Sequence, residues 1–390
     1  MKYLQILKDK FNQDQLLVLF SCFVLTFPFY ISGPIYVIEA LYLLYTKKGI
    51  DAFKNTPKIK YLYLFLGLSL IVSVISKNLI GVGCVVAIAI FIMLMLYYRE
   101  HITPELFELI VDLLIFLSIF WAIYGLYEQT VILHRLGYSH FTLKIFSRRE
   151  NRLNSVFFNA NYYAMMIEFL IMMITYKFFT TKHNIKKSIY YVCVGLLNVF
   201  MLYMTGCRTA LIAIAGAMII FLIINKNYKL CTLIGIGFLA IVAFFFIHPD
   251  KFPRIEYLLS NYAVRIKIWK AAIQGIKAHP LFGQGPMTYM MIFKQYGGHA
   301  TQHAHSVYLD PILSFGIVGI GLLVPYVIDN FKRLFIVVKQ NLNRSYFALV
   351  ISCIVVILLH GTLDYTIFWL HTGLLFLFIA NSFAMYPQTH

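Results

Sequence analysis

Long apolar runs recur along the whole chain, most of them about 16 to 23 residues long, with short polar or basic segments between them. An α-helix needs about 20 such residues to cross a bilayer, whereas a transmembrane barrel shows alternating segments of about ten residues. We therefore predict an all-α polytopic membrane protein of about twelve spans. The expected spans are Leu16–Ile31, Pro34–Tyr45, Tyr61–Ser76, Leu79–Tyr98, Leu106–Tyr127, Phe157–Phe179, Ile189–Thr205, Ala210–Ile224, Leu230–Ile247, Val307–Ile328, Phe347–His360 and Tyr365–Met385.

The first two runs form the least regular part of this pattern. The second is short, which indicates one half of a hairpin that turns at Ser32, Gly33 and Pro34. The amphipathic start MKYLQILKDKFNQDQ has no small-residue cleavage site after it. We therefore expect the first span to remain in the protein.

Composition supports this interpretation and excludes an ordinary soluble globule. Of 390 residues, 61% are hydrophobic and 13% are charged, and the mean hydropathy is +0.77. We expect one integral membrane domain over residues 1–390. The six cysteines lie in or at the ends of apolar runs without CxxC spacing, so we interpret them as core residues, with no disulfide framework and no metal site.

Cytoplasmic loops of membrane proteins collect lysine, which explains part of the net charge of +17. The lysines of the short loops predict the orientation in the membrane, and we expect no nucleic-acid partner. With both termini in the cytoplasm, every cytoplasmic loop is basic. The extracytoplasmic segments are then Glu128–Val156, Gly206–Thr209, Gly361–Asp364 and one large loop, residues 248–306, in which we expect short helices and part of the active site. We predict a multi-pass membrane protein with its active site on the extracytoplasmic side.

The predicted outer side is rich in arginine. It holds seven of the ten arginines but only seven of the twenty-three lysines, and eight of the twelve histidines lie on it or at its edge. Arginine is favoured where planar, multidentate recognition of phosphate or carboxylate is needed. The outer side therefore has the composition of an anion site.

The most polar long segment is Asn261–Ile320, and its first half has helical periodicity. One predicted side is apolar (Ile266, Ile268, Trp269, Ala272, Ile273, Ile276) and the other is polar (Lys267, Lys270, Gln274, Lys277). Arg265 falls on the apolar side, where a guanidinium must face a polar cavity or an anion. A salt bridge to Glu256 is the alternative. Pro280 and the glycines that follow it should end the helix.

Two further arginines are candidate ligands for an anion. Arg208 lies between two spans, beside a Thr205-Gly206 turn whose N–H groups would also face an anion; the alternative is an arginine that snorkels at a helix end. Arg152 precedes Asn159 and Asn161, which either support the site or merely cap a helix. Arg148 and Arg149 are more typical of surface charge.

His305 is the candidate catalytic residue because it precedes a membrane helix, near the outer surface, and has no carboxylate adjacent in sequence. A neutral imidazole there suits a general base that takes a proton from a sugar hydroxyl; a helix-capping histidine is the alternative. His299, His303 and His305 also have metal-ligand spacing, but the neighbouring arginines favour an anion over zinc. Among the intramembrane carboxylates Glu39, Asp112, Glu168 and Asp310, the last is nearest this site and precedes Pro311, where the helix can kink.

No D-x-D pair and no P-loop occurs in the sequence, so we expect no metal or nucleotide cofactor.

Four segments in order resemble the O-antigen ligase/polymerase family, the integral membrane glycosyltransferases of bacterial surface polysaccharides. They are RLNSVFFNANYYA (Arg152–Ala164), TGCRTAL (Thr205–Leu211), RIKIWKAAIQGIKAHPLFGQG (Arg265–Gly285) and HAHSVYLDPILSFGIVGIG (His303–Gly321). They cover roughly the middle half of the chain.

The resemblance implies a donor glycan on undecaprenyl diphosphate, an acceptor glycan, and an inverting transfer that needs no metal. It implies diphosphate binding by Arg208, Arg265 and Arg152, catalysis by His305, and a location in the bacterial inner membrane. From their positions in the sequence we also expect Asn161, His303 and Asp310 to support the site. The family often has His-Asn where this chain has His305-Ser306. A flippase and a chain-length regulator are the implied partner proteins.

We therefore expect a polymerase that joins lipid-linked repeat units of capsule, exopolysaccharide or O-antigen. A ligase that transfers the finished glycan to another acceptor is the alternative within the same class. A flippase or transporter of lipid-linked sugars is a less favoured alternative, because such proteins show inverted repeats and a concentration of charges at mid-membrane, whereas the polar residues here crowd one surface.

Overall fold

The structure, a computed structural model, describes residues 2–145, 151–181, 184–249 and 258–387. Its regular elements are all helical, as predicted, and these ranges contain no strand. In chain order the α-helices are α1 (Lys2–Lys10), α2 (Gln13–Val24), α3 (Phe29–Tyr45), α4 (Lys48–Lys54), α5 (Ile59–Ile75), α6 (Leu79–His101), α7 (Pro104–Arg135), α8 (Ala160–Thr180), α9 (Ile185–Thr205), α10 (Arg208–Ile224), α11 (Tyr228–Ile247), α12 (Leu258–Ala278), α13 (Thr288–Ile292), α14 (Leu309–Lys339), α15 (Arg344–His360) and α16 (Leu370–Asn381). Two 3₁₀-helices, η4 (Thr366–Phe368) and η5 (Ser382–Met385), flank α16.

Six of the described helices are long and apolar enough to cross a membrane: α6, α7, α8, α9, α11 and α14. A seventh span is possible if α4 and α5, which meet at 113°, count as one broken span. Five shorter apolar helices, α2, α3, α10, α15 and α16, occupy the remaining predicted spans. The protein is therefore a multi-pass membrane protein, and the full count of twelve stays a prediction.

Helix α11 shows why the bundle needs lipid around it. None of its described residues is buried, and Leu233, Ile236, Leu239 and Phe246 are each 60% to 77% exposed. An apolar surface of this extent would drive aggregation in water. In a bilayer the same surface contacts acyl chains, and the helix satisfies its own backbone hydrogen bonds.

The predicted turn at Ser32, Gly33 and Pro34 is wrong. The chain breaks earlier, between α2 and α3, and α3 continues through Pro34. Pro28 forms the N-cap instead, with extended backbone angles, and its carbonyl accepts hydrogen bonds from the N–H groups of Ile31 and Ser32. The first predicted span therefore ends at Val24 rather than at Ile31.

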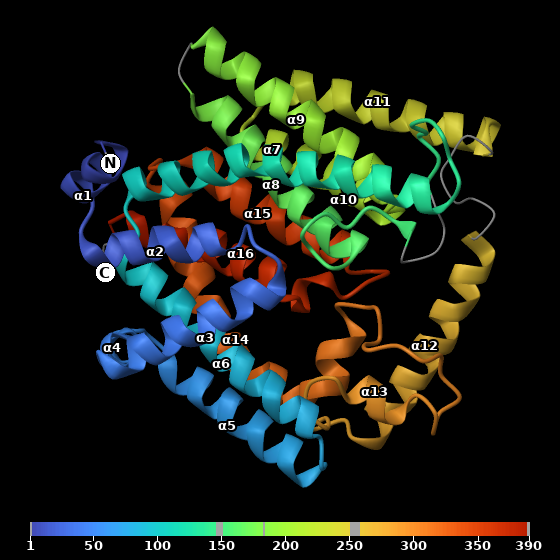
Figure 1. Cartoon of the computed structure of the whole chain (residues 1–390). Coiled ribbons are helices and arrows are strands. Elements are labelled where there is room, and N and C mark those ends of the chain that lie inside the picture. Colours follow the sequence, from blue (N-terminus) through green and yellow to red (C-terminus); the bar gives the residue numbers. More distant parts are fainter. Residues whose placement is uncertain (1, 146–150, 182–183, 250–257, 388–390) are drawn as a thin grey trace.

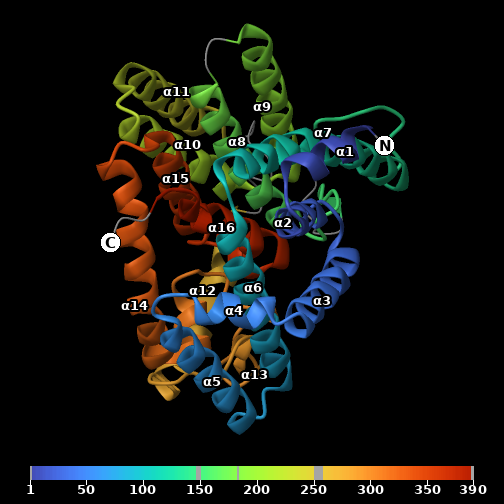
Figure 2. The same cartoon turned by 90° about the vertical axis from the view of Figure 1, so that its left-hand side faces the viewer.

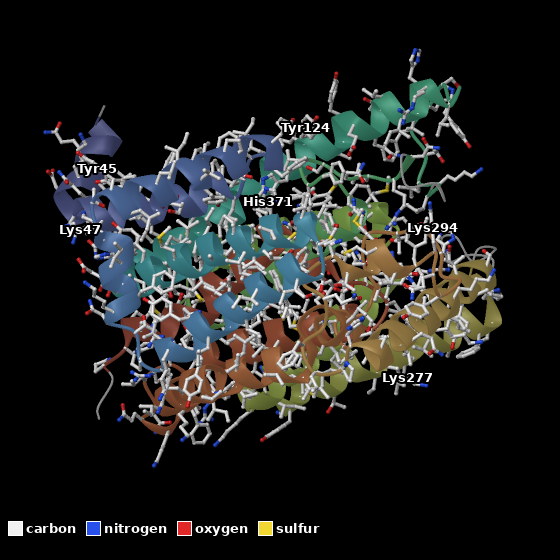
Figure 3. All side chains as sticks on the ribbon, turned by 90° about the horizontal axis from the view of Figure 1, so that it is seen from below. Tyr45, Lys47, Tyr124, Lys277, Lys294 and His371 are labelled. Atoms are coloured by element: carbon white, nitrogen blue, oxygen red, sulfur yellow. The ribbon has the colours of Figure 1, made fainter. Side chains whose placement is uncertain are left out.

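Helix α8 is the centre of the bundle, since side chains around its whole circumference are buried. Figures 1 and 2 show it enclosed by its neighbours, with α10 and α15 packed together on one side. Lys47 lies at one end of the bundle and Lys277 and Lys294 lie at the other (Figure 3). The basic loop after α3 and the large loop that contains α12 and α13 therefore lie at opposite ends.

Helix α14 breaks at Gly316, which has φ 63° and ψ 178°, and the loop after α12 inserts at this break. The freed N–H groups of Ile317 and Val318 donate to the carbonyls of Pro280 and Leu281 at 3.0 and 2.9 Å. A Cβ at Gly316 would lie 2.3 Å from the Leu281 oxygen, so only glycine allows this approach. The kink predicted at Asp310-Pro311 is wrong, because Pro311 lies in the first turn of α14, where its missing N–H has no intrahelical partner to lose.

A small hydrophobic cluster of α12, α13 and α14 holds the large loop together. Its buried members are Ile268, Ala271, Ala272, Tyr289, Ile292, Ala304 and Leu313. Ala304 is fully buried in this cluster, and it separates the two histidines of the candidate site. Apolar burial thus positions a loop that is otherwise polar.

Candidate active site

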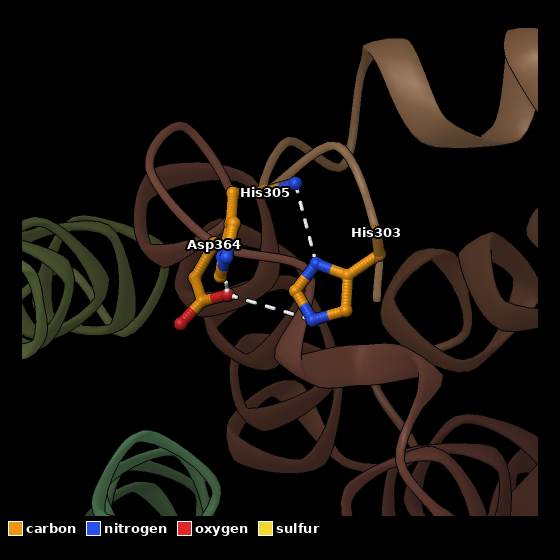
Figure 4. Close-up of side chains that lie close together, drawn as sticks. All are labelled: His303, His305 and Asp364. Atoms are coloured by element: carbon orange, nitrogen blue, oxygen red, sulfur yellow. Dashed lines mark hydrogen bonds and ion pairs between the residues drawn. The ribbon is translucent and has the colours of Figure 1, made fainter. Parts of the chain in front are cut away.

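His305 is paired with a carboxylate that is distant in sequence. Its Nδ1 lies 2.8 Å from Oδ1 of Asp364, in the turn between α15 and η4 (Figure 4). Because an aspartate oxygen accepts, Nδ1 carries the proton and Nε2 keeps its lone pair. Nε2 lies 2.9 Å from the hydroxyl oxygen of Thr301, which then donates to it. The imidazole is therefore held in the tautomer that a general base requires.

The backbone at His305 is left-handed, with φ 49°. Residues other than glycine rarely adopt this conformation, and it costs of order 1 to 3 kcal/mol when the surroundings enforce it. The N–H of His305 donates to Nδ1 of His303 at 3.2 Å, which helps to offset this cost. Such strain is concentrated at functional sites.

His303 is buried beside His305, and its Nε2 lies 4.0 Å from Oδ1 of Asp364. Burial, with help from His305 and Arg265, lowers the pKa of His303 to about 4. The ring is therefore neutral at pH 7 and serves as a polar support.

Asp310 anchors the loop that carries both histidines. Its Oδ2 accepts from the N–H of Ala304 at 2.5 Å, and Ser314 donates to its Oδ1 at 3.3 Å. The carboxylate thus fixes the backbone between His303 and His305. The structure places Asp310 beside the candidate site, as predicted, and its supporting role stays a prediction.

Asp364 continues the network into α8. Its Oδ2 accepts from the amide of Asn161, and the Oδ1 of Asn161 accepts from Nη2 of Arg152 at 2.8 Å. Burial raises the pKa of Asp364, but the neighbouring side chains of His305, His303 and Arg265 outweigh burial. Together they hold the pKa of this carboxyl group well below its usual range. Asn159, not Asn161, is the N-cap of α8, so the side chain of Asn161 belongs to the network.

Arg152 is 8% exposed, and its Nε donates to the carbonyl of Thr205 at 2.8 Å. It joins the start of α8 to the Thr205–Arg208 turn. Burial lowers the pKa of Arg152, while the neighbouring Asp364 opposes that effect. Arg148 and Arg149 lie outside the described residues.

Arg265 lies on the inward side of α12 with Ile268 and Ala272, as the periodicity predicted, and the four polar residues of the other side are exposed. The prediction for Ile273 is wrong, since it is 41% exposed. Burial lowers the pKa of Arg265, and the nearby Asp364 opposes that effect. Glu256 lies outside the described residues.

Arg208 is the first residue of α10, and it is near enough to Arg152 to contribute to the lowered pKa of that guanidinium. Arg152 therefore joins the network of Asp364 by hydrogen bonds, Arg265 is near enough to affect the pKa of Asp364, and Arg208 is near Arg152. His305, Arg265 and Arg208 come from three distant segments, and the fold brings them to one region at the same end of the bundle as the large loop.

Sequence reasoning missed Asp364, Thr301 and His360. Asp364 was assigned only to a turn, because no local spacing connects it to a histidine 59 residues earlier. Of the predicted carboxylates, Glu168 does not reach this site but pairs with His360 at 2.8 Å.

The ligand atoms of His303, His305 and Asp364 lie within 4.8 Å of one another, so this group has the composition of a metal site. His299, the third histidine of the predicted metal pattern, is not part of the group. Nδ1 of His305 already donates to Asp364, and the positively charged Arg265 lies nearby. These surroundings favour an anion over a cation.

Comparison with known proteins agrees with the geometry. Residues 193–324 match the family model described as O-Antigen ligase, a segment that contains Arg208, Arg265, His303 and His305. No curated protein matches the chain. The match supports a membrane enzyme that acts on O-antigen glycans. The resemblance to the O-antigen ligase/polymerase family, predicted from four motifs, is therefore confirmed over residues 193–324.

Proposed function

We propose that the protein is a glycosyltransferase that polymerises oligosaccharide repeat units carried on undecaprenyl diphosphate, at the outer leaflet of the bacterial cell membrane. The product is a capsular, exopolysaccharide or O-antigen chain. The observation that carries this proposal is the oriented pair of His305 and Asp364, 2.8 Å apart, with three arginines around it.

The histidine acts on the acceptor. A hydroxyl of the acceptor sugar replaces that of Thr301 at Nε2 of His305 and gives up its proton there. Its oxygen attacks the anomeric carbon of the donor, the bond from that carbon to the diphosphate oxygen breaks, and undecaprenyl diphosphate leaves. Attack opposite the leaving group inverts the anomeric centre.

The arginines act on the donor. A diphosphate leaving group needs charge stabilisation rather than protonation, and guanidinium groups supply it in a water-poor site. Arg265 and Arg208 are the proposed ligands. Arg152 was predicted as a third, but its hydrogen bonds to Thr205 and Asn161 favour a positioning role.

Transfer of the finished glycan to another acceptor uses the same chemistry, so the ligase is the second candidate function. The matched family description favours it. A deletion strain distinguishes the two, since single lipid-linked repeat units accumulate without a polymerase and long lipid-linked chains accumulate without a ligase.

Turnover of a defined undecaprenyl-diphosphate oligosaccharide by the purified protein tests the proposal. We expect His305→Ala to abolish chain extension without loss of expression or membrane insertion. His299→Ala is the matched control, because its side chain is exposed on the same loop. Near-normal extension by His305→Ala would disprove the base assignment. If the protein instead moves labelled lipid across liposomes without extending any glycan, it is a flippase.

A further inference from the structure

A second histidine–carboxylate pair lies in the bundle interior. Nδ1 of His360, the last residue of α15, lies 2.8 Å from Oε2 of Glu168 in α8, and both side chains are completely buried. A buried ionisable pair in a membrane bundle is costly and indicates function. The proposed transfer reaction uses neither residue.

The other ring nitrogen of His360 faces a cysteine. Its Nε2 lies 3.8 Å from Sγ of Cys207, which precedes α10. Thiol, imidazole and carboxylate therefore form a chain in which the carboxylate orients the base and the base faces the nucleophile. This arrangement of three groups activates thiols in enzymes.

The charges around Cys207 favour the thiolate. The guanidinium of Arg152 is close enough to the thiol to lower its pKa, and Arg208 follows Cys207 in sequence. Burial raises the pKa of the Cys207 thiol and Glu168 acts in the same direction, but His360 and Arg152 outweigh them and leave it below its ordinary value. The start of α10 adds the positive end of a helix dipole.

Access to this thiol is narrow. Cys207 is 7% exposed, and it lines a crevice of about 10 Å³ with Tyr203, Gly206 and Arg208. This volume holds roughly one water molecule. A reagent must therefore be small to reach the sulfur.

From this geometry we propose that Cys207 is an activated thiol and a site of covalent modification by small soft electrophiles, with His360 as its base and Glu168 as the group that orients the base. With methyl methanethiosulfonate, Sγ attacks the sulfenyl sulfur, a disulfide forms, and methanesulfinate leaves. The thiol proton passes to Nε2 of His360 and then to water.

Modification would also affect glycan transfer, a consequence that rests on the proposed function. The added methylthio group would lie near Arg152, in the turn that presents Arg208 to the donor. We expect modified protein to lose at least about tenfold in turnover, because one misplaced charged ligand has an effect of this size.

The test measures labelling of the full-length protein by methyl methanethiosulfonate, with peptide mass spectrometry, at pH 6 and pH 8.5. Cys231 is the control, because it is partly exposed in the first turn of α11, at the end of the span rather than in its middle. The rate at an ordinary thiol should rise about 100-fold between these pH values, with its thiolate fraction. For Cys207 we expect a rise of less than about tenfold. A pH profile parallel to that of Cys231, or no labelling of Cys207, would overturn the proposal.

The variants His360→Gln and Glu168→Gln test the relay. Each should restore the steep pH profile at Cys207 while Cys353, buried without such a partner, stays unlabelled. Labelling of Cys353 would show that the variant has lost its fold. In that case the pH profile of Cys207 labelling in the wild-type protein alone decides the proposal. An unchanged flat profile in correctly folded His360→Gln would exclude His360 as the base. Because labelling needs no glycan substrate, its outcome is independent of the proposed transferase activity.

Discussion

The substitution Asp364→Asn isolates the orienting role of the carboxylate. Asparagine keeps the size of the side chain but presents an amide, which can donate to Nδ1 of His305 where the carboxylate accepts from it. The proton of His305 then moves to Nε2, and the ring loses the lone pair that faces Thr301. We expect the protein to fold and bind donor but to transfer glycan very slowly.

The size of this effect follows from the chemistry that it removes. General base catalysis contributes about 10² to 10⁴ in rate, or about 3 to 5 kcal/mol of transition-state stabilisation. Since Arg265 and Arg208 remain, KM for the lipid-linked donor should change by less than about threefold. The loss should therefore appear in kcat.

Single-turnover extension of a defined lipid-linked oligosaccharide measures kcat, and titration of the donor gives KM. Melting in detergent provides the control for folding. A loss of less than about fivefold in kcat, or an equal loss in Asp364→Asn and in the exposed control His299→Ala, would refute the base mechanism. A large rise in KM alone would instead assign Asp364 to substrate binding.

Three further predictions concern the arginines, the buried histidine and metal. Arg265→Lys keeps the charge but loses the planar fork of hydrogen-bond donors, so activity should fall at least about tenfold. Lys270→Ala, on the exposed side of α12, should leave activity unchanged. Full activity of Arg265→Lys would show that any positive charge suffices. The pKa of His303 is lowered from an ordinary value of 6.5 to about 4 in the folded protein. Between these pH values the unfolded chain binds a proton that the folded protein does not, so the free energy of unfolding falls as the pH falls from 6.5 to 4. At 1.36 kcal/mol for each pH unit, the free energy of unfolding falls by about 3 kcal/mol over this range. The melting temperature of His303→Gln should therefore depend less on pH between 6.5 and 4 than that of the wild type. The same pH dependence in both proteins would contradict the assignment. Treatment with a chelator should leave turnover unchanged, and loss of activity that zinc restores would make His303, His305 and Asp364 a metal site.

Hydrophobic runs and charge predicted most of the architecture because both are local properties. Helix positions follow from apolar length, and the end of α12 follows from Pro280 and glycine. Arg265 was assigned correctly to the inward side because helical periodicity determines direction without any knowledge of the neighbours. The hairpin near Pro34 failed because a membrane helix can continue through an interior proline, and Pro28 had already set the start of α3.

Contacts between distant segments could not be predicted in this way. Asp364 and His305 are 59 residues apart, and Cys207 and His360 are 153 apart. Each residue, taken alone, was consistent with a turn or a core position. Only packing around α8 decides which side chains meet, and one sequence contains no signal for such pairs.

The arrangement of α8 explains why both histidine–carboxylate pairs occur together. Asn161 and Glu168 are seven residues apart, two helical turns, and therefore lie on one side of α8. Asn161 contacts Asp364 and Glu168 contacts His360, so this side of α8 holds both ends of the turn after α15. His305 and Cys207 then meet their partners on a single rigid support. A shift of α8 relative to that turn would disturb both pairs at once, whereas a substitution at Glu168 alone should alter the thiol first and leave the Asp364–His305 hydrogen bond in place.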